Sequence, residues 1–169
     1  MSEFTYDPRI LQFIDRLSRL DAGEKARLKR NAGDQLSQAR NATTLFYRLL
    51  PAGVSQYQEE IYFLVATIYP ITSAGGAGNL GDSLRHARDE KTNAKGLDRR
   101  IEILLDANLE QLPFRLRQAI QYLQSNRIPV NWQQLLTDLL LWSHPDRPVQ
   151  RRWARSYFAN QNIHSNKEI

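Results

Sequence analysis

Several residue types and patterns are missing from this sequence, and each absence excludes a class of protein. Cysteine is absent from all 169 residues, so neither a disulfide framework nor a thiolate metal site can form. The longest apolar run, residues 61–69, is far shorter than the roughly 20 residues that span a bilayer. Residues 1–4 are acidic rather than basic, and no apolar signal segment follows them. We therefore expect a cytoplasmic protein that does not bind membranes.

The patterns that usually indicate catalysis or metal binding are also missing. His86, His144 and His164 are scattered, and none has a partner at metal-ligand spacing on one helix. Neighbouring acids such as Glu59 and Glu60 face different ways on a helix, which makes them a poor acid and base pair. No Gly-x-Ser-x-Gly turn is present. We expect no enzymatic activity, no metal, no cofactor and no small-molecule substrate.

One motif with a nucleotide-binding pattern occurs in an unsuitable context. Residues 76–81 match Gly-x-Gly-x-x-Gly, in which glycines let a strand-to-helix turn approach a pyrophosphate. Here a helical pattern and Pro70 precede the match, and no strand pattern is available. We interpret residues 73–78 as a mobile loop. The backbone amides that follow Asn79 could still meet a nucleic-acid phosphate at a helix start.

The pattern that is present throughout is helical. Hydrophobic residues make up 41% of the chain and recur at three-and-four spacing, whereas no segment alternates with a period of two. This predicts an all-α fold of about nine helices in two packed bundles, residues 1–95 and 96–169, the second ending in a frayed tail from Asn160. The third helix is expected to contain the stripe from Ala39 to Leu49.

Helix starts are predicted by capping boxes, in which a short polar side chain and a residue three positions later satisfy each other's backbone amides. Asp21 with Glu24 and Asn108 with Gln111 have this form, as does the pair at residues 131 and 134. Pro129 separates the helix that Asn108 opens from the helix that begins after residue 131. We expect those two helices to pack against each other through their apolar faces.

The formal net charge is +5, and its distribution is uneven. The helix opened by Asp21 contains Arg27, Lys29 and Arg30, and the last helix places Arg151, Arg152 and Arg155 on the face opposite its apolar residues. Together these faces are typical of a surface that follows nucleic-acid phosphates. Each of the tryptophans, Trp132, Trp142 and Trp153, could stack on a base, but each lies at an apolar helical face, which favours core packing.

At this point the chain resembles the CasB family, the small subunit of the type I-E Cascade complex in bacterial CRISPR immunity. The resemblance extends from about residue 13 to residue 158. It rests on short segments in a fixed order: residues 20–24 followed by 28–30, 46–49, 79–81, the pair Arg99 and Arg100, 112–117, 130–142 and 151–155.

The resemblance implies a non-enzymatic, all-helical protein that functions in antiviral defence. Family members are present as two copies, contact CRISPR RNA and target DNA through backbone phosphates, help to hold the displaced strand, and touch the backbone and large subunits of Cascade. By position, the family's phosphate-facing residues fall on Lys29, Arg30, Arg48, Arg99, Arg100 and Arg117. Arg27, Arg151 and Arg152 are added from helical faces alone. Asp82 and Gln118 stand where many relatives have basic residues.

A second hypothesis remains open at this stage. The chain could be a helical protein–protein scaffold module whose basic faces meet acidic protein surfaces, without direct contact to nucleic acid. Sensitivity of its association to added DNA or RNA would distinguish the two.

Overall fold

The computed structural model describes residues 4–159, and within that range it contains nine α-helices and no β-strand. The predicted all-α fold class is therefore confirmed. The helices are α1 (Pro8–Ser18), α2 (Ala22–Lys29), α3 (Thr43–Leu49), α4 (Glu59–Ile68), α5 (Leu80–His86), α6 (Ala94–Leu105), α7 (Leu112–Ser125), α8 (Trp132–Leu139) and α9 (Pro148–Ala154). A π-helical turn, Arg155–Ala159, continues α9. The tail from Asn160, predicted to be frayed, lies outside the described residues.

Two of the predicted capping boxes form in full. The Asp21 carboxylate accepts a hydrogen bond from the Glu24 amide at 2.8 Å, and the Glu24 carboxylate accepts one from the Asp21 amide at 3.2 Å. Asn108 and Gln111 exchange the same pair of bonds, at 3.2 and 2.9 Å, immediately before α7. These bonds satisfy backbone amides that have no partner within the helix, and they fix where α2 and α7 begin.

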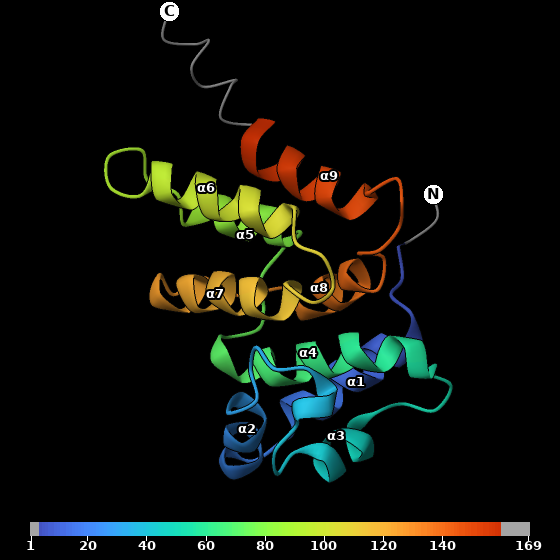
Figure 1. Ribbon diagram of the computed structural model, residues 1–169. Coiled ribbons are helices and arrows are strands. Elements are labelled where there is room, and N and C mark those ends of the chain that lie inside the picture. Colours follow the sequence, from blue (N-terminus) through green and yellow to red (C-terminus); the bar gives the residue numbers. More distant parts are fainter. Residues whose placement is uncertain (1–3, 160–169) are drawn as a thin grey trace, which may run out of the picture.

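The helices lie in stacked layers (Figure 1). α7 and α8 form a middle layer, with α5, α6 and α9 on one side of it and α4 and α1 on the other. α2 and α3 lie beyond α4 and α1, at the far end of the molecule from α9. α7 thus lies between α6 on one side and α4 and α2 on the other. Basic side chains on its exposed face can therefore lie next to basic side chains of both α6 and α2.

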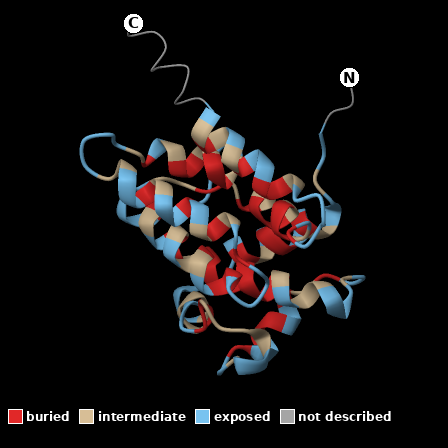
Figure 2. Cartoon of the chain, turned by 45° about the horizontal axis from the view of Figure 1, so that its top comes forward, coloured by how far each residue is buried: buried red, intermediate tan, exposed pale blue. Residues whose placement is uncertain are grey.

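The core is one continuous cluster of buried side chains. It joins residues from the first half, such as Phe13, Phe46 and Phe63, to residues from the second, such as Leu116 and Trp132. Figure 2 shows that buried residues face the interior along most helices, whereas exposed residues cover their outer sides. The division into residues 1–95 and 96–169 stays a prediction.

The third helix begins later than the stripe from Ala39 predicts. A short 3₁₀ turn, Leu36–Gln38, comes first, and Asn41 adopts the left-handed backbone with a φ of 57°. The buried Asn31 accepts a hydrogen bond from the Arg40 amide at 2.7 Å and donates one to the Arg40 carbonyl at 3.0 Å. Since these bonds take up the backbone groups of Arg40, the helix cannot run through this position.

The expectation that α7 and α8 pack face to face is wrong. α8 packs mainly against α1 and α4, and α7 packs against α4, α5 and α6. The connection between them is held elsewhere: the Val130 amide donates to the Ser73 carbonyl at 3.0 Å, and the Gly76 amide donates to the Val130 carbonyl at 3.3 Å. These bonds tie the glycine loop to the α7–α8 connection, and α8 then packs on α1 and α4.

Two of the three glycines of the Gly-x-Gly-x-x-Gly match, Gly76 and Gly81, allow close backbone packing. A Cβ atom on Gly76 would lie 2.5 Å from the Pro129 carbonyl oxygen. In α5, a Cβ atom on Gly81 would meet the Trp153 carbonyl group, with its carbon at 3.0 Å and its oxygen nearer still. Only glycine fits such contacts. A helix and a 3₁₀ turn precede this loop in the described chain, so the match lacks the strand that a nucleotide-binding turn of this kind requires.

A charged network ties the last turn to the α5–α6 connection. The Arg88 guanidinium donates to both oxygens of Asp98, at 3.0 and 3.3 Å, and the Tyr157 hydroxyl donates to the same carboxylate. Burial alone would raise the pKa of Asp98, but these hydrogen bonds outweigh it and hold the pKa below its usual value. The network therefore fixes the C-terminal turn against the protein body.

Candidate nucleic-acid interface

The end of α2 places two cations beside α7. Lys29 is the last residue of α2 and Arg30 follows it, and both are exposed. Arg117 of α7 lines the same depression, which has a volume of about 360 Å³ and also contacts Gln121. We call Lys29, Arg30 and Arg117 the α2–α7 cluster. None of the described residues that line this depression is a carboxylate, so its three positive charges make it suited to an anion.

Arg117 is held in place by its surroundings. Gly33, with a φ of 92°, packs so closely on this side chain that a Cβ atom there would lie 3.3 Å from Cδ of Arg117. The Nε atom of Arg117 is shielded from solvent and has no hydrogen-bond partner among the described residues. A buried donor without a partner costs about 1–3 kcal/mol. A ligand in the depression cannot reach this shielded atom, so it would contact Arg117 through the rest of the side chain that lines the depression.

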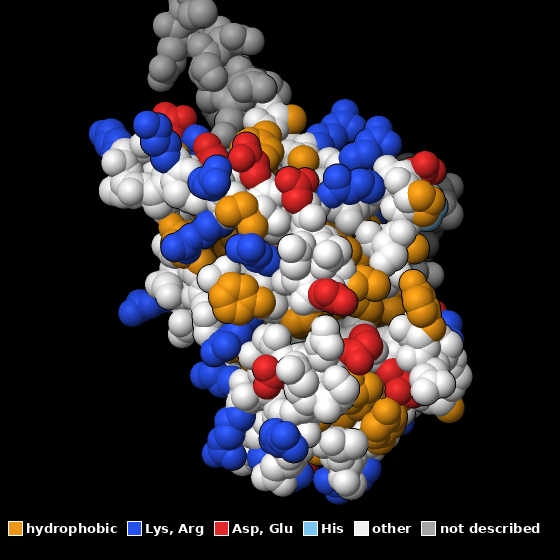
Figure 3. Space-filling model, in the orientation of Figure 1, with side chains coloured by type: hydrophobic (Ala, Val, Ile, Leu, Met, Phe, Trp, Pro, Cys, Tyr) orange, Lys and Arg blue, Asp and Glu red, His pale blue; other side chains and the backbone are white. Residues whose placement is uncertain are grey.

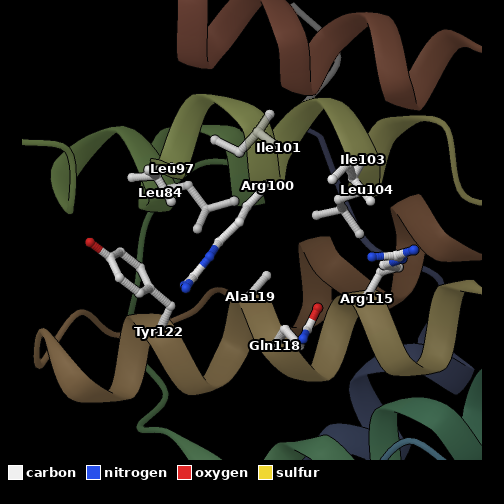
Figure 4. A pocket seen from close by; sticks show the side chains of 10 residues that line it. All are labelled: Leu84, Leu97, Arg100, Ile101, Ile103, Leu104, Arg115, Gln118, Ala119 and Tyr122. Carbon is white, nitrogen blue, oxygen red and sulfur yellow. The ribbon is translucent and has the colours of Figure 1, made fainter. Parts of the chain in front are cut away.

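A second pair of cations lies where α6 faces α7 (Figure 4). The Arg100 guanidinium reaches from α6 and lies 5.3 Å from the centre of the Tyr122 ring, a distance typical of a cation–π contact. Arg115 of α7 lines the same narrow cleft further along the helix. We call Arg100 and Arg115 the α6–α7 cluster. Arg99 is exposed on α6 beside it.

Most of these charges are free of carboxylates. Among the nine basic residues predicted from the sequence, only Arg152 forms an ion pair within residues 4–159. An unpaired surface cation keeps its full attraction for phosphate, whereas a paired one must first give up its partner. The two clusters on α2, α6 and α7 are therefore available to an anionic ligand.

The cations of α9 form a separate group. Figure 3 shows Lys and Arg side chains over α9 apart from those that run down the opposite flank over α6, α7 and α2. Arg151 and Arg152 are both exposed, but Nη2 of Arg152 lies 3.6 Å from the buried carboxylate of Asp138. The sequence predicts that the basic faces of α9 and α2 form one surface, whereas in the structure they lie apart.

Asp138 connects α8 to α9 in the interior. Its carboxylate accepts hydrogen bonds from Trp153 Nε1 and Gln134 Nε2, both at 2.8 Å. Burial raises the pKa of Asp138, although these two bonds and the charge of Arg152 oppose the change. Arg152 therefore stabilises a buried acid in addition to being exposed to solvent.

The other two predicted residues lie outside both clusters. Arg27 donates from Nε to the Asn41 carbonyl at 3.0 Å, which connects α2 to the turn before α3. Arg48 is exposed on α3, next to Tyr47, whose hydroxyl donates to Glu59 at 2.8 Å. Neither arginine lines the depression between α2 and α7.

The three tryptophans are buried, as the apolar faces favour, so they cannot stack on a base. An exposed aromatic ring does lie near the cations: Phe114 of α7 has 52% of its surface accessible. Neither Phe114 nor Arg115 was among the site residues predicted from the sequence. The helical stripe Leu112, Leu116, Ile120 and Leu123 contained the signal, because Phe114 falls on the opposite side.

Membrane-spanning helices and metal-binding clusters are both absent from the residues that the structure describes. Between residues 4 and 159, no helix combines the length and apolar character needed to cross a bilayer. The same part of the chain contains no group of three His, Asp or Glu side chains placed to hold a metal ion. His164 lies outside it.

Comparison with known proteins identifies the family. The model of the family described as CRISPR-associated protein Cse2 matches residues 24–158. The chain belongs to the Cse2 family. A Cse2 protein of Thermus thermophilus is 36% identical over 104 residues, which make up 61% of this chain and 59% of that protein. The chain thus spans about three fifths of the curated relative that it matches.

Solved structures of Cse2 relatives have the same fold. The crystal structure of M. ruber CasB is 26% identical, with 95% of this chain and 98% of that one covered and a TM-score of 0.77. CasB from Thermus thermophilus is 28% identical, with 89% and 96% covered and a TM-score of 0.73. A chain of a CRISPR RNA-guided surveillance complex, 23% identical, shares the fold with 95% and 98% covered and a TM-score of 0.78. The resemblance to the CasB family is confirmed.

The structure explains one acidic departure of this Cse2 chain. The Asp82 carboxylate accepts a hydrogen bond from the Asn79 amide at 3.0 Å, and the Asn79 side chain accepts one from the Asp82 amide at 3.1 Å. Asp82 therefore forms the capping box that begins α5. The other departure, Gln118, lines the cleft between α6 and α7.

Proposed function

We propose that this Cse2 chain is a non-enzymatic small subunit of a type I-E CRISPR RNA-guided surveillance complex, in cytoplasmic antiviral defence. It binds the backbone of the CRISPR RNA and target DNA without regard to sequence, and it helps to retain the displaced strand. Membership of the Cse2 family supports this role. The observation that carries the proposal is the set of unpaired cations in the α2–α7 and α6–α7 clusters, which follow one flank of the molecule (Figure 3).

The physical mechanism requires no pocket for a base. Lysine and arginine that neutralise phosphates release condensed counterions, and this gain does not depend on sequence. Pairing between guide and target reads the sequence, and exchanging one duplex for the other is nearly balanced in free energy. A subunit that binds the displaced strand therefore shifts that balance toward the open state. Arg117, which lines the depression together with Lys29 and Arg30, is expected to contact a phosphate there.

The first test is a salt series with fluorescence anisotropy. The full chain is measured against two labelled single strands of unrelated sequence. The variant Lys29→Ala/Arg30→Ala removes two exposed cations of the α2–α7 cluster. We expect this variant to bind both strands more weakly, by the same factor. The slope of log affinity against log salt should fall by about 1.4, because each lost phosphate contact accounts for about 0.7 with single strands. Arg99→Ala/Arg100→Ala should act in the same direction.

A matched control removes the same charge elsewhere. Arg9 and Arg19 are already paired, with Asp7 at 2.9 Å and Asp15 at 3.1 Å. Arg9→Ala/Arg19→Ala changes the net charge by the same amount and should leave the salt slope unchanged. Equal losses of affinity in Lys29→Ala/Arg30→Ala and Arg9→Ala/Arg19→Ala would mean that binding follows net charge alone. A strong preference for one of the two strand sequences would contradict binding through the backbone.

A contact with protein subunits, including the second copy of this chain, is the other proposed role. A groove of about 300 Å³ lies between the layers and is lined mainly by apolar side chains, among them Tyr57 and Leu109, which are exposed at its edge. Asp34, Glu60 and Glu110 border it. Such a groove suits an apolar side chain flanked by lysine or arginine on a neighbouring subunit. Co-purification of the other subunits after nuclease treatment, and its loss in Leu109→Asp, would support this role.

A further inference from the structure

Phe114 of α7 has an exposed aromatic ring next to the basic clusters. Phe114 lies on the side of α7 opposite the buried residues Leu116 and Ile120, and 52% of its surface is accessible. It therefore contributes little to the core. Single exposed apolar residues are common on proteins, so exposure by itself indicates nothing. What distinguishes Phe114 is its position between two groups of cations.

The helical geometry of α7 sets that position. With about 100° between successive residues, Arg117 projects about 60° to one side of Phe114 and Arg115 about 100° to the other. Arg117 belongs to the α2–α7 cluster, and Arg115 belongs to the α6–α7 cluster. Figure 3 shows hydrophobic side chains on this flank with Lys and Arg above and below them. The ring thus stands on a ridge with positive charge on both sides.

This arrangement has the parts of a single-strand binding surface. Proteins that bind single strands without sequence preference combine cations that follow the backbone with aromatic rings on which bases stack. Phenylalanine has no hydrogen-bonding group, so its ring accepts any base. A duplex cannot use such a ring, because its bases are already stacked within the helix.

We propose that Phe114 stacks on a base of a single-stranded nucleic acid whose phosphates run across the α2–α7 and α6–α7 clusters. This inference rests on the proposed function and deepens it, because it adds a base contact to the backbone contacts. The chain then discriminates between single and double strands while remaining indifferent to sequence. A displaced strand, with unpaired bases, is a suitable ligand of this kind.

The test compares strands with and without bases. A labelled oligothymidine and an abasic strand with the same number of phosphates are titrated with the full chain. We expect the wild type to bind oligothymidine more tightly. Phe114→Ala should weaken oligothymidine binding by about five- to a hundredfold, the range typical of a single base stack. Its affinity for the abasic strand, and both salt slopes, should not change.

Two further variants separate stacking from apolar contact, and one serves as a control. Phe114→Trp retains a flat ring and should preserve the preference for oligothymidine, whereas Phe114→Leu retains apolar character without the ring and should lose it. Tyr57→Ala removes another exposed ring, 75% accessible, that lines the groove bordered by Asp34 and Glu60. This variant should not change the affinity for either strand.

Three results would overturn the inference. Equal binding of the two strands by the wild type, with a normal salt slope, refutes the stack and leaves the phosphate contacts standing. Unchanged oligothymidine affinity in Phe114→Ala, with loss of partner subunits on co-purification, makes the ring a protein contact. If neither strand binds, or binding does not depend on salt, the proposed function fails together with the inference.

Discussion

Two glycines, each in the first turn of its helix, offer a comparison in which one chemical change should have opposite effects. Gly81 in α5 is buried, and a Cβ atom there would meet the carbonyl group of Trp153. Gly96 in α6 is exposed, and a Cβ atom there has nothing within 4 Å. We expect Gly81→Ala to destabilise the protein and Gly96→Ala to stabilise it.

The magnitudes follow from two terms. Replacing glycine by alanine in a helix contributes up to about 1 kcal/mol of stability in either variant, because alanine loses less backbone entropy on folding. In Gly81→Ala the new methyl group also forces α5 away from α9, and such overpacking typically costs about 1–3 kcal/mol. Since the propensity term is common to both variants, their difference in free energy of unfolding is the steric term alone.

Urea denaturation followed by tryptophan fluorescence measures this difference, because all three tryptophans are buried. A spread of about 1–3 kcal/mol corresponds to about 2–12 °C in melting temperature for a chain of this size. The native spectrum of Gly81→Ala should also shift, since Trp153 is the residue displaced. If Gly81→Ala proves as stable as Gly96→Ala, the close approach of α5 and α9 is refuted.

Three other predictions concern the acids Asp138, which is buried, and Asp98, which is partly buried. Asp138→Ala removes the acceptor of Trp153 Nε1 and should lower the free energy of unfolding by about 1–3 kcal/mol in urea melts, whereas Asp146→Ala, on an exposed side chain, should change little. The pKa of Asp98 is lowered in the folded state, so this carboxylate stabilises the protein above the usual carboxylate pKa, and the stabilisation disappears as the pH falls. In melts between about pH 3 and pH 7, Asp98→Asn should therefore lose less stability on acidification than the wild type. Burial raises the pKa of Asp138, so its contribution to the free energy of unfolding falls as the pH rises through that pKa. Asp138→Asn should remove this dependence on pH. Parallel slopes in the two asparagine variants would contradict these assignments.

The elements that could be predicted from the sequence are those fixed by local chemistry. The Asp21 and Glu24 box begins α2 because both partners lie within four residues of each other. The start of α3 was misplaced because the hydrogen bonds between Asn31 and Arg40 join residues across a turn. Asparagine tolerates the left-handed backbone seen at Asn41, and no periodicity indicates when it does so.

The candidate site shows the same division. The sequence placed Lys29 and Arg30 on an exposed helix end, but only the folded structure reveals that Arg117 of α7 lines the same depression. The pairing of Arg152 with Asp138 could not be predicted, because the two residues lie on different helices. Long-range packing therefore decides which of several similar arginines share a surface.

The ion pair between Arg152 and Asp138 has a consequence for comparing relatives. Asp138 has only 1% of its surface accessible, yet its ion pair restrains the exposed guanidinium of Arg152. A neutral residue at position 138 would release Arg152 to solvent without altering a single outward-facing side chain. Two relatives with the same arginines on α9 can thus differ in their attraction for phosphate through one interior position that no nucleic acid ever touches.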